Sequence, residues 1–495
     1  MSILQGQYTH NLPQIAYCAQ EVKLHEEQAA LNSGTTLSEL MQRAGHALFE
    51  LTRDKSVKNI LIFTGKGNNA GDGFMLAKRC LHAQIHVTVC ALFEPSLLKG
   101  DAAEAYQLFF RSGGRVVSLR SCIDGKYDAI VDAVFGNGFR GELPEQVKEA
   151  FNHFKSSKAW KLAVDIPSGV NGTTAEVSPC SFQADTTLTF IALKQGMLTG
   201  NARHLCGELL LADLGIAYAF ADLSHTNCCY PGGKYLRTLR PIRAADSYKN
   251  QCGHVLLIGG GKGMAGAIRL AAEACLRTGA GLVSVATHPE NQAAVLHGRY
   301  ELMVHGVAVT TELDTLLNKA DVVVIGPGLG QDAWAKKMYK AVKEYKGLVV
   351  CDADGLNLLA QSHLPWHRAI LTPHFGEAKR LLGEPTVNTS KRFELAEQLS
   401  KEYAACIVLK GPGSLIVDGK RVNINRSGCS AMASAGMGDV LSGIIAGLLA
   451  QGLSRFEAAT LGVYIHGLAA EQAARDGQLG MLASDLFDHI RGIMG

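Results

Sequence analysis

Short apolar runs that end in glycine or polar clusters recur along almost the whole chain, with helix-like stretches between them. In the first half, expected strands at 59–63, 85–92, 129–135, 162–166 and 186–190 accompany expected helices at 74–83, 100–110 and 145–154. In the second half, expected strands at 255–258, 283–286, 322–325, 348–351 and 407–409 accompany an expected helix at 267–277. This alternation predicts doubly wound, mostly parallel sheets covered by helices.

The length of the chain predicts two domains. Its 495 residues exceed the size at which a single hydrophobic core stops growing. The alternation loosens between about residues 218 and 245, where His225-Thr226-Asn227 and Pro231-Gly232-Gly233 favour a connector. We therefore predict two doubly wound α/β domains, 1–224 and 225–495.

Composition excludes several classes of protein. A chain with 47% hydrophobic residues, 19% charged residues and 54 glycines is neither disordered nor fibrous. The net charge of +3 gives no electrostatic footprint for nucleic acid. The 13 cysteines include no C-x-x-C pair, which favours reduced thiols in the cytoplasm. No apolar stretch reaches the roughly 20 residues that span a bilayer, so we expect no membrane segment.

The motif Ser434-Ala435-Gly436-Met437-Gly438-Asp439 opens directly into the apolar run 440–450. The free N–H groups at a helix start form an anion site, and glycine lets a phosphate approach the backbone. A carboxylate repels phosphate unless it removes a proton from an attacking hydroxyl or holds a metal ion. The motif therefore suggests phosphoryl chemistry, although a helix dipole alone also favours an acidic residue there.

A second phosphate-binding arrangement lies near the other end of the chain. The strand 59–63 runs into Gly65-Lys66-Gly67-Asn68-Asn69-Ala70-Gly71-Asp72-Gly73, and a helix is expected from Phe74. Strand, glycine-rich turn and helix in this order bind phosphates at the carboxyl end of an α/β sheet. Further upstream, Thr36 and Glu39 have the spacing of a capping box before another helix.

Five more clusters follow strands of the second half. They are Gly259-Gly260-Gly261, Gly326-Pro327-Gly328-Leu329-Gly330, Asp352-Ala353-Asp354, Thr372-Pro373-His374 and Lys410-Gly411-Pro412-Gly413-Ser414. Any one of them is explained by a tight turn. Five in register are harder to explain by turns alone.

With these motifs, the part of the chain from about Leu236 to the end resembles the ribokinase-like, ADP- or ATP-dependent NAD(P)H-hydrate dehydratases. The first half is similar to the NAD(P)H-hydrate epimerase domain through residues 68–73, Asp132 with residues 136–141, and Asp165-Ile166-Pro167-Ser168-Gly169. Both halves in this order resemble the bifunctional family that restores hydrated NADH and NADPH. The resemblance implies a Rossmann-like three-layer sandwich followed by a ribokinase-like sandwich.

For the second domain, the resemblance implies that Asp439 is the base that deprotonates the hydroxyl of the S hydrate, with ADP as donor and AMP and phosphate as products. The implied nucleotide site comprises Lys410, Gly411, Pro412, Gly413, Ser414, Gly438 and Asp439, and the implied hydrate site comprises Ala265, Gly328 and His374. Two alternatives remain open, because Lys410 is also explained as a solvated strand-end lysine and His374 as a helix cap. Mg²⁺ is expected for phosphoryl transfer, with Asp352, Asp354 and Glu377 as candidate outer-shell partners.

For the first domain, the resemblance implies interconversion of the R and S hydrates with Asp165 as proton-exchanging residue. The implied dinucleotide site comprises Asn68, Asn69, Ala70, Gly71, Asp72, Gly136, Asn137, Gly138, Phe139, Arg140, Gly141, Glu142 and Asp165, and the implied K⁺ ligands are Asn69, Asp132 and Ser168. Without the resemblance, Asp132 is a strand-end turn residue and Asn69 a left-handed turn residue. The sequence does not show whether Lys194 faces this site.

Two positions depart from the family pattern, because Ala70 replaces a usual glycine and Met437 replaces a small residue. Alanine is acceptable at a negative φ, and Met437 is acceptable if its side chain enters the core. A second hypothesis makes the C-terminal half a kinase of a small alcohol and the N-terminal half a dinucleotide sensor, and a third gives that half a nucleic-acid role. The fusion and the His374 loop favour repair. We also expect a homo-oligomer, while the preferences for NADH or NADPH hydrate and for ADP or ATP stay open.

Overall fold

The computed structural model describes residues 8–383 and 391–495, and the chain divides into two compact units. The first unit ends at Cys228 and the second begins at Cys229, four residues beyond the boundary expected from the sequence. The expected connector at 218–245 contains two short helices, α8 (Ala217–Leu223) and α9 (Gly233–Thr238). Each buries a single apolar residue, Phe220 or Leu236, so neither has a recognisable periodicity.

The first unit contains a seven-stranded sheet in the order β3-β2-β1-β4-β5-β6-β7, and each neighbouring pair runs parallel. Its strands are β1 (Asn59–Thr64), β2 (His86–Ala91), β3 (Val116–Val117), β4 (Ala129–Ala133), β5 (Trp160–Val164), β6 (Thr186–Phe190) and β7 (Glu208–Ala212). Its other helices are α1 (Ala19–Asn32), α2 (Leu37–Asp54), α3 (Asn68–His82), α4 (Gly100–Arg111), α5 (Leu119–Cys122), α6 (Glu145–Phe154) and α7 (Gly200–Leu205).

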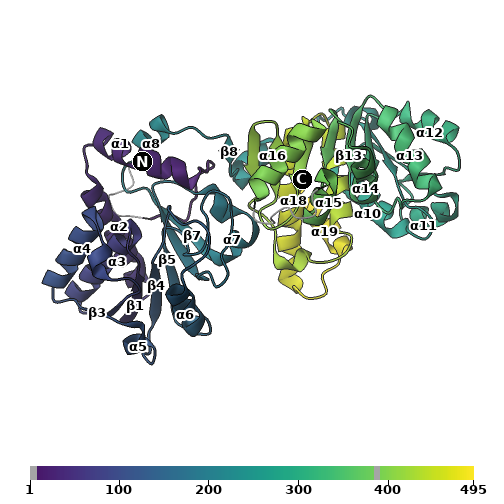
Figure 1. Cartoon of the computed structure of the whole chain (residues 1–495). Helices are drawn as coiled ribbons and strands as arrows, with labels where there is room; N and C mark the ends of the chain where they lie inside the picture. The colour runs from purple at the N-terminus through teal and green to yellow at the C-terminus, as the bar shows by residue number, and fades with distance from the viewer. Residues whose placement is uncertain (1–7, 384–390) are drawn as a thin grey trace. The chain divides into compact units, whose positions relative to one another are not determined.

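Both faces of the first sheet are covered by helices. In β1, Ile60 and Ile62 belong to the core shared with α2, α3 and α4, whereas Leu61 and Phe63 belong to the core shared with α6. Figure 1 shows α2, α3 and α4 on one side of the sheet and α6 on the other. This is the expected doubly wound, three-layer arrangement.

The second unit contains a sheet in the order β11-β10-β9-β12-β13-β14-β15-β16-β17, to which the two-residue β8 (Cys228–Cys229) adds at the edge. Its strands are β9 (His254–Ile258), β10 (Leu282–Thr287), β11 (Met303–Gly306), β12 (Val322–Ile325), β13 (Leu348–Cys351), β14 (Ala369–Leu371), β15 (Cys406–Leu409), β16 (Leu415–Asp418) and β17 (Arg421–Ile424). The sheet is parallel as far as β15, and β16 and β17, which the sequence did not predict, continue it in antiparallel pairs.

Helices of the second unit connect and cover these strands. They are α10 (Ala265–Thr278), α11 (Gln292–Leu296), α12 (Thr310–Leu317), α13 (Ala333–Glu344), α14 (Ala353–Ser362), α15 (Phe375–Leu382), α16 (Arg392–Tyr403), α17 (Met437–Ala450), α18 (Arg455–Ala473) and α19 (Leu486–Met494). The helices α10, α17, α18 and α19 share one core with alternate residues of the strands. Because the chain winds outward in both directions from β9 and β12, the crossover helices of the two halves lie on opposite faces.

All 13 cysteines lie in the described residues, and none of them forms a disulfide bond. Within the described residues, no helix combines the length and hydrophobicity that crossing a bilayer requires.

Candidate functional site

The candidate site of the first unit lies where the strand order reverses, between β1 and β4. In open α/β sheets, the carboxyl ends of the strands beside such a reversal form a crevice for ligands. Residues 65–73 follow β1, Asp132 lies within the end of β4 with residues 136–142 after it, and Asp165 follows β5. The fold therefore brings the predicted dinucleotide segments to one edge of the sheet.

Residues 68–72 form the first turn of α3 and not the glycine-rich loop that the sequence suggested, because α3 begins at Asn68 rather than Phe74. Ala70 lies outside the positive-φ region and is fully buried, so alanine is unstrained there. The glycines serve close packing, because a Cβ at Gly71 would lie 2.4 Å from Met41 Sδ. Asn69 is correspondingly helical, and the suggestion of a left-handed turn residue is wrong.

The loop 136–142 contacts this helix through Gly136. A Cβ at Gly136 would lie 3.0 Å from Asn69 Oδ1 and 3.3 Å from Asp165 Oδ2, so glycine permits a close approach of three segments. The buried Asn69 Nδ2 and Asn137 Oδ1 have no hydrogen-bond partner among the described residues. These unsatisfied groups suit a polar ligand.

The later residues of this loop differ in their surroundings. Phe139 is buried in the core beside α6 and packs against Phe135, so its ring does not face solvent. Gly138, Arg140, Gly141 and Glu142 are exposed, and Glu142 forms an ion pair with Lys148 at 3.5 Å.

Asp165 is held by a buried network that the sequence did not reveal. Its Oδ1 accepts hydrogen bonds from Lys194 Nζ at 2.5 Å, Thr189 Oγ1 at 3.1 Å and the Phe190 N–H at 3.1 Å. Lys194 is fully buried, and its ammonium also donates to Thr189 Oγ1 at 3.0 Å and Phe190 O at 2.7 Å. The ammonium has three protons, so its donors are used within the protein.

The backbone of Asp165 adds to this constraint. Its φ is +65°, a left-handed conformation that costs a non-glycine residue free energy and is concentrated at functional sites. With Oδ1 engaged by three donors, Oδ2 is the oxygen that lies near Gly136. One carboxylate oxygen of Asp165 thus lies next to the candidate dinucleotide loop.

Asp132 is fully buried and surrounded by neutral donors. Its Oδ1 accepts from Ser168 Oγ at 2.6 Å and the Val134 N–H at 3.1 Å, and its Oδ2 accepts from the Ser168 N–H at 2.6 Å. Burial raises its pKa to about 6 despite these bonds. The carboxylate oxygens of Asp132, the Asn69 amide oxygen and the Ser168 hydroxyl are oxygen donors, and these residue types fit a hard monovalent cation.

Two further carboxyl groups, those of Glu26 and Asp72, lie near Asp165 in the first unit. Burial, followed by the charge of Asp165, raises the pKa of Glu26 on α1 to about 7. Burial and the charges of Asp165 and Glu26 raise the pKa of Asp72 well above its usual value. Sequence reasoning missed Glu26, because α1 lies far from the motifs along the chain and has only a weak amphipathic pattern.

The candidate site of the second unit lies along the carboxyl ends of β9, β12, β13, β14 and β15. The loops there touch through their backbones. The Gly261 N–H donates to Gly328 O at 2.7 Å, and the Lys410 N–H donates to Pro373 O at 2.9 Å. Gly328 has a φ of +56°, and a Cβ there would lie 2.7 Å from Met264 O, beside Ala265 at the start of α10.

The Gly-x-Gly-Asp motif begins a helix, as predicted. Gly436 caps α17 with a φ of +86°, and Asp439 lies in the first turn. Met437 is buried in the core, which confirms the condition under which it was acceptable. Burial, then the charges of Asp352 and Asp354, raise the pKa of Asp439 to about 7, whereas Lys410 acts in the opposite direction.

Lys410 is not a solvated strand-end lysine. Its Nζ donates to Asp352 Oδ1 at 2.8 Å and lies 3.7 Å from Glu377 Oε2. Ser442 Oγ donates to Asp352 Oδ2 at 2.6 Å, so both oxygens of this buried carboxylate are occupied. Burial alone would raise the pKa of Asp352, but the Lys410 charge and these hydrogen bonds lower it.

The same ammonium lies beside the helix start. A Cβ at Gly438 would be 3.3 Å from Lys410 Nζ, so the two predicted nucleotide-binding residues come together. The loop after Lys410 requires glycine, because Gly411 has a φ of +140° and Gly413 a φ of +57°. Ser414 Oγ donates to Gly411 O at 3.0 Å and fixes this turn.

Arg392, at the start of α16, is a buried cation that sequence reasoning missed. A Cβ at Gly411 would lie 3.0 Å from its Nη1. Its charge therefore lies beside the predicted nucleotide loop.

His374 caps α15, which confirms the structural alternative for this residue. Its Nδ1 accepts from the Gly376 N–H at 2.9 Å and the Glu377 N–H at 3.3 Å. Its side chain is 53% exposed, and its Nε2 lies 3.5 Å from Glu377 Oε1. Within residues 8–383 and 391–495, no group of three or more His, Cys, Asp or Glu side chains is arranged to hold a metal ion.

Known proteins match both units. The NAD(P)H-hydrate dehydratase family model matches residues 255–491, and the model for the YjeF-related protein N-terminus matches residues 37–196. A ribokinase-like superfamily protein of Enterococcus faecalis has a similar structure, with a TM-score of 0.51 and 30% identity over 55% of this chain and 96% of that one. The expected ribokinase-like fold of the second unit is thereby confirmed.

Relatives also match almost the whole length. The bifunctional NAD(P)H-hydrate repair enzyme of Coxiella burnetii is 43% identical over 94% of this chain and 96% of the relative. The enzyme of the same name from Escherichia coli is 40% identical over 98% of this chain and 95% of the relative. The chain therefore belongs to the family of bifunctional NAD(P)H-hydrate repair enzymes.

Proposed function

We propose that this chain repairs hydrated nicotinamide cofactors, with the first unit interconverting the R and S hydrates and the second dehydrating the S form at the expense of ADP. The observation that carries the proposal is Asp439, a carboxylate with its pKa raised to about 7 at the start of α17. A base of this pKa beside a phosphate-binding helix start suits the deprotonation of a hydroxyl that attacks a phosphoryl group.

The dehydration proceeds in two steps. Asp439 accepts the proton of the ring hydroxyl, whose oxygen attacks the β-phosphorus of ADP as the bond to the AMP oxygen breaks. The ring nitrogen lone pair then expels phosphate, and loss of a proton from the adjacent ring carbon restores the reduced ring. The balance is hydrate plus ADP to NAD(P)H, AMP and phosphate.

The glycines and Lys410 serve the transfer step. The N–H groups of residues 436–438 face the transferring phosphoryl group, and Lys410 supplies a positive charge beside Gly438. The loop 411–414 holds the nucleotide, whereas Ala265, Gly328 and His374 contact the hydrate. Mg²⁺ would neutralise phosphate charge, held chiefly by the nucleotide because Asp352 is already paired with Lys410 and Ser442.

In the first unit, Asp165 exchanges the proton that epimerisation requires, through the Oδ2 oxygen near Gly136. Lys194 holds the carboxylate in place through Oδ1. Residues 68–72 and 136–142 hold the dinucleotide. Asn69, Asp132 and Ser168 would hold K⁺, which would supply positive charge beside the bound dinucleotide.

Two properties of the whole protein belong to the same proposal. The 13 cysteines, none of them in a disulfide bond, suit a reducing compartment, which favours the cytoplasm. A homo-oligomer, implied by the family resemblance, is checked by light scattering of the purified chain.

The proposal is tested with the full chain, a mixture of R and S NADH hydrate, Mg²⁺, K⁺ and ADP. We expect complete recovery of the reduced-nicotinamide absorbance, with one AMP and one phosphate released per hydrate. Recovery that stops when the S form is consumed contradicts the epimerase. Stable phosphate on an organic product contradicts the dehydratase and favours a kinase. The D439N variant is the control for the second unit.

A further inference from the structure

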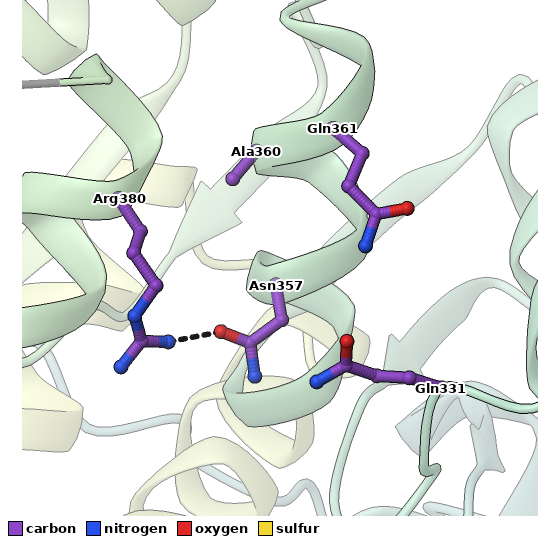
Figure 2. Close-up of a pocket in the computed structure, with 5 residues that line it drawn as sticks. All are labelled: Gln331, Asn357, Ala360, Gln361 and Arg380. Carbon is purple, nitrogen blue, oxygen red and sulfur yellow. Dashed lines mark hydrogen bonds between the residues drawn. The ribbon is translucent and has the colours of Figure 1, made fainter.

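A polar pocket of about 430 Å³ lies in the second unit, between the loop that follows β12 and the helices α14 and α15. It is lined by Gln331, Asn357, Ala360, Gln361 and Arg380 (Figure 2). Its volume lies in the range of small-ligand sites. None of the assigned catalytic or binding residues lines it.

The pocket shares structural elements with the candidate hydrate site. Gln331 follows Gly330 in the loop that contains Gly328, and Arg380 lies on α15, whose cap is His374. Arg380 is six positions after His374, which corresponds to about 9 Å along a helix axis. A ligand that contacts Gly328 and His374 with one end can therefore reach the pocket with another part.

Hydrogen bonds connect the pocket to this loop. The Arg380 guanidinium donates to Asn357 Oδ1, and Asn357 Nδ2 donates to Asp354 Oδ1 at 3.3 Å. Asp354 Oδ2 accepts the Gly330 N–H at 2.8 Å. Both oxygens of Asp354 thus accept hydrogen bonds, and Figure 2 shows the Arg380 side chain bonded to Asn357.

The residues that line the pocket favour the binding of an anion. Among the described residues that line it, Arg380 is the only charged one, and the other polar groups are the amides of Gln331, Asn357 and Gln361. A guanidinium has five N–H donors in a planar fork, so donors remain for a phosphate after the bond to Asn357. Amide NH₂ groups add neutral donors around it.

We propose that this pocket binds a phosphate group of the hydrated dinucleotide, away from the reacting ring. The proposal rests on the function proposed above, because the ligand is the dehydratase substrate. The dinucleotide has two sources of such phosphate: the pyrophosphate present in both hydrates and the 2′-phosphate present only in NADPH hydrate. Arg380 is then a specificity residue and not a catalytic one.

The test compares R380Q with K379Q in the full chain, because both variants remove one positive charge from neighbouring positions of α15. The Lys379 side chain lies over the Phe375 ring and does not line the pocket. We measure kcat and KM of the dehydratase for the S forms of NADH and NADPH hydrate at saturating ADP. R380Q is expected to raise KM by about tenfold with kcat nearly unchanged, whereas K379Q leaves both constants near wild type.

The pattern of the KM change identifies the phosphate. An equal rise for both hydrates assigns the pyrophosphate, and a rise for NADPH hydrate alone assigns the 2′-phosphate. If R380Q matches K379Q for both hydrates, the phosphate subsite is refuted, while wild-type turnover still supports the proposed function. If the wild type itself restores neither cofactor, the proposed function fails.

A second variant keeps the test independent of any loss of folding. Gln361 is exposed on α14, so Q361K should fold and adds a cation to the pocket. It is expected to lower KM for the same hydrate that R380Q impairs. An unchanged or higher KM contradicts the proposal.

Discussion

The dehydratase should lose activity as the pH falls below about 7, because Asp439 accepts a proton only in its ionised form. Burial and the neighbouring charges of Asp352 and Asp354 raise its pKa from the ordinary 3.8 to about 7. At pH 6 only about one tenth of Asp439 is then ionised, and at pH 5 about one hundredth. We expect kcat/KM for the S hydrate to fall about tenfold per pH unit on this limb.

The assay follows reduced-nicotinamide absorbance in pre-formed S NADH hydrate with ADP and Mg²⁺ from pH 5 to 8.5. Phosphate monoesters also titrate near pH 6, so the wild-type profile alone does not assign the limb to the protein. The D354N variant removes a charge that raises the Asp439 pKa, while its amide oxygen can still accept the Gly330 N–H. Its acid limb should move to lower pH with the same nucleotide. A flat wild-type profile down to pH 5, or superimposable profiles of the two proteins, would refute the reasoning.

Three further predictions concern the first unit. D165N should slow epimerisation by about 10² to 10⁴-fold without changing dehydration of the S hydrate, measured by separate assays on each pure epimer. K194M leaves the buried Asp165 charge unpaired and should destabilise the first unit by about 3 to 5 kcal/mol, seen as a lower unfolding temperature, whereas an unchanged temperature contradicts a structural ion pair. Replacing choline by K⁺ at constant ionic strength should raise that temperature more at pH 8 than at pH 5. The folded pKa of Asp132 is raised from 3.8 to about 6, so the protein loses stability between about pH 4 and pH 6, and a bound cation restores that loss at pH 8. D132N should abolish the difference.

Local patterns in the sequence determined the class of fold and the ends of several elements. Thr36 and Glu39 form the predicted capping box, and α2 begins at Leu37. The Gly-x-Gly-Asp motif starts α17, because an acidic residue in the first turn before an apolar run marks a helix start within a few residues. Short apolar runs predicted most of the parallel strands, since strands buried on both faces need continuous hydrophobic sequence.

Local patterns failed where a feature depended on distant residues. The turn from Asn68 to Gly73 is helical because Gly71 and Gly73 allow α3 to pack closely on Met41 and Ala133, which no local propensity reveals. The antiparallel strand β16 has only four residues and was missed for the same reason, because its pairing with β15 and β17 defines it.

Tertiary structure alone decided the electrostatics of both sites. The sequence placed Asp165 at the end of a strand and Asp439 at the start of a helix. The family resemblance suggested their roles. The sequence did not show that Lys194, 29 residues away, holds Asp165 in place. It also did not show that Lys410 pairs with Asp352, 58 residues away. Charge interactions depend on distance in space and on burial, and neither is encoded by spacing along the chain.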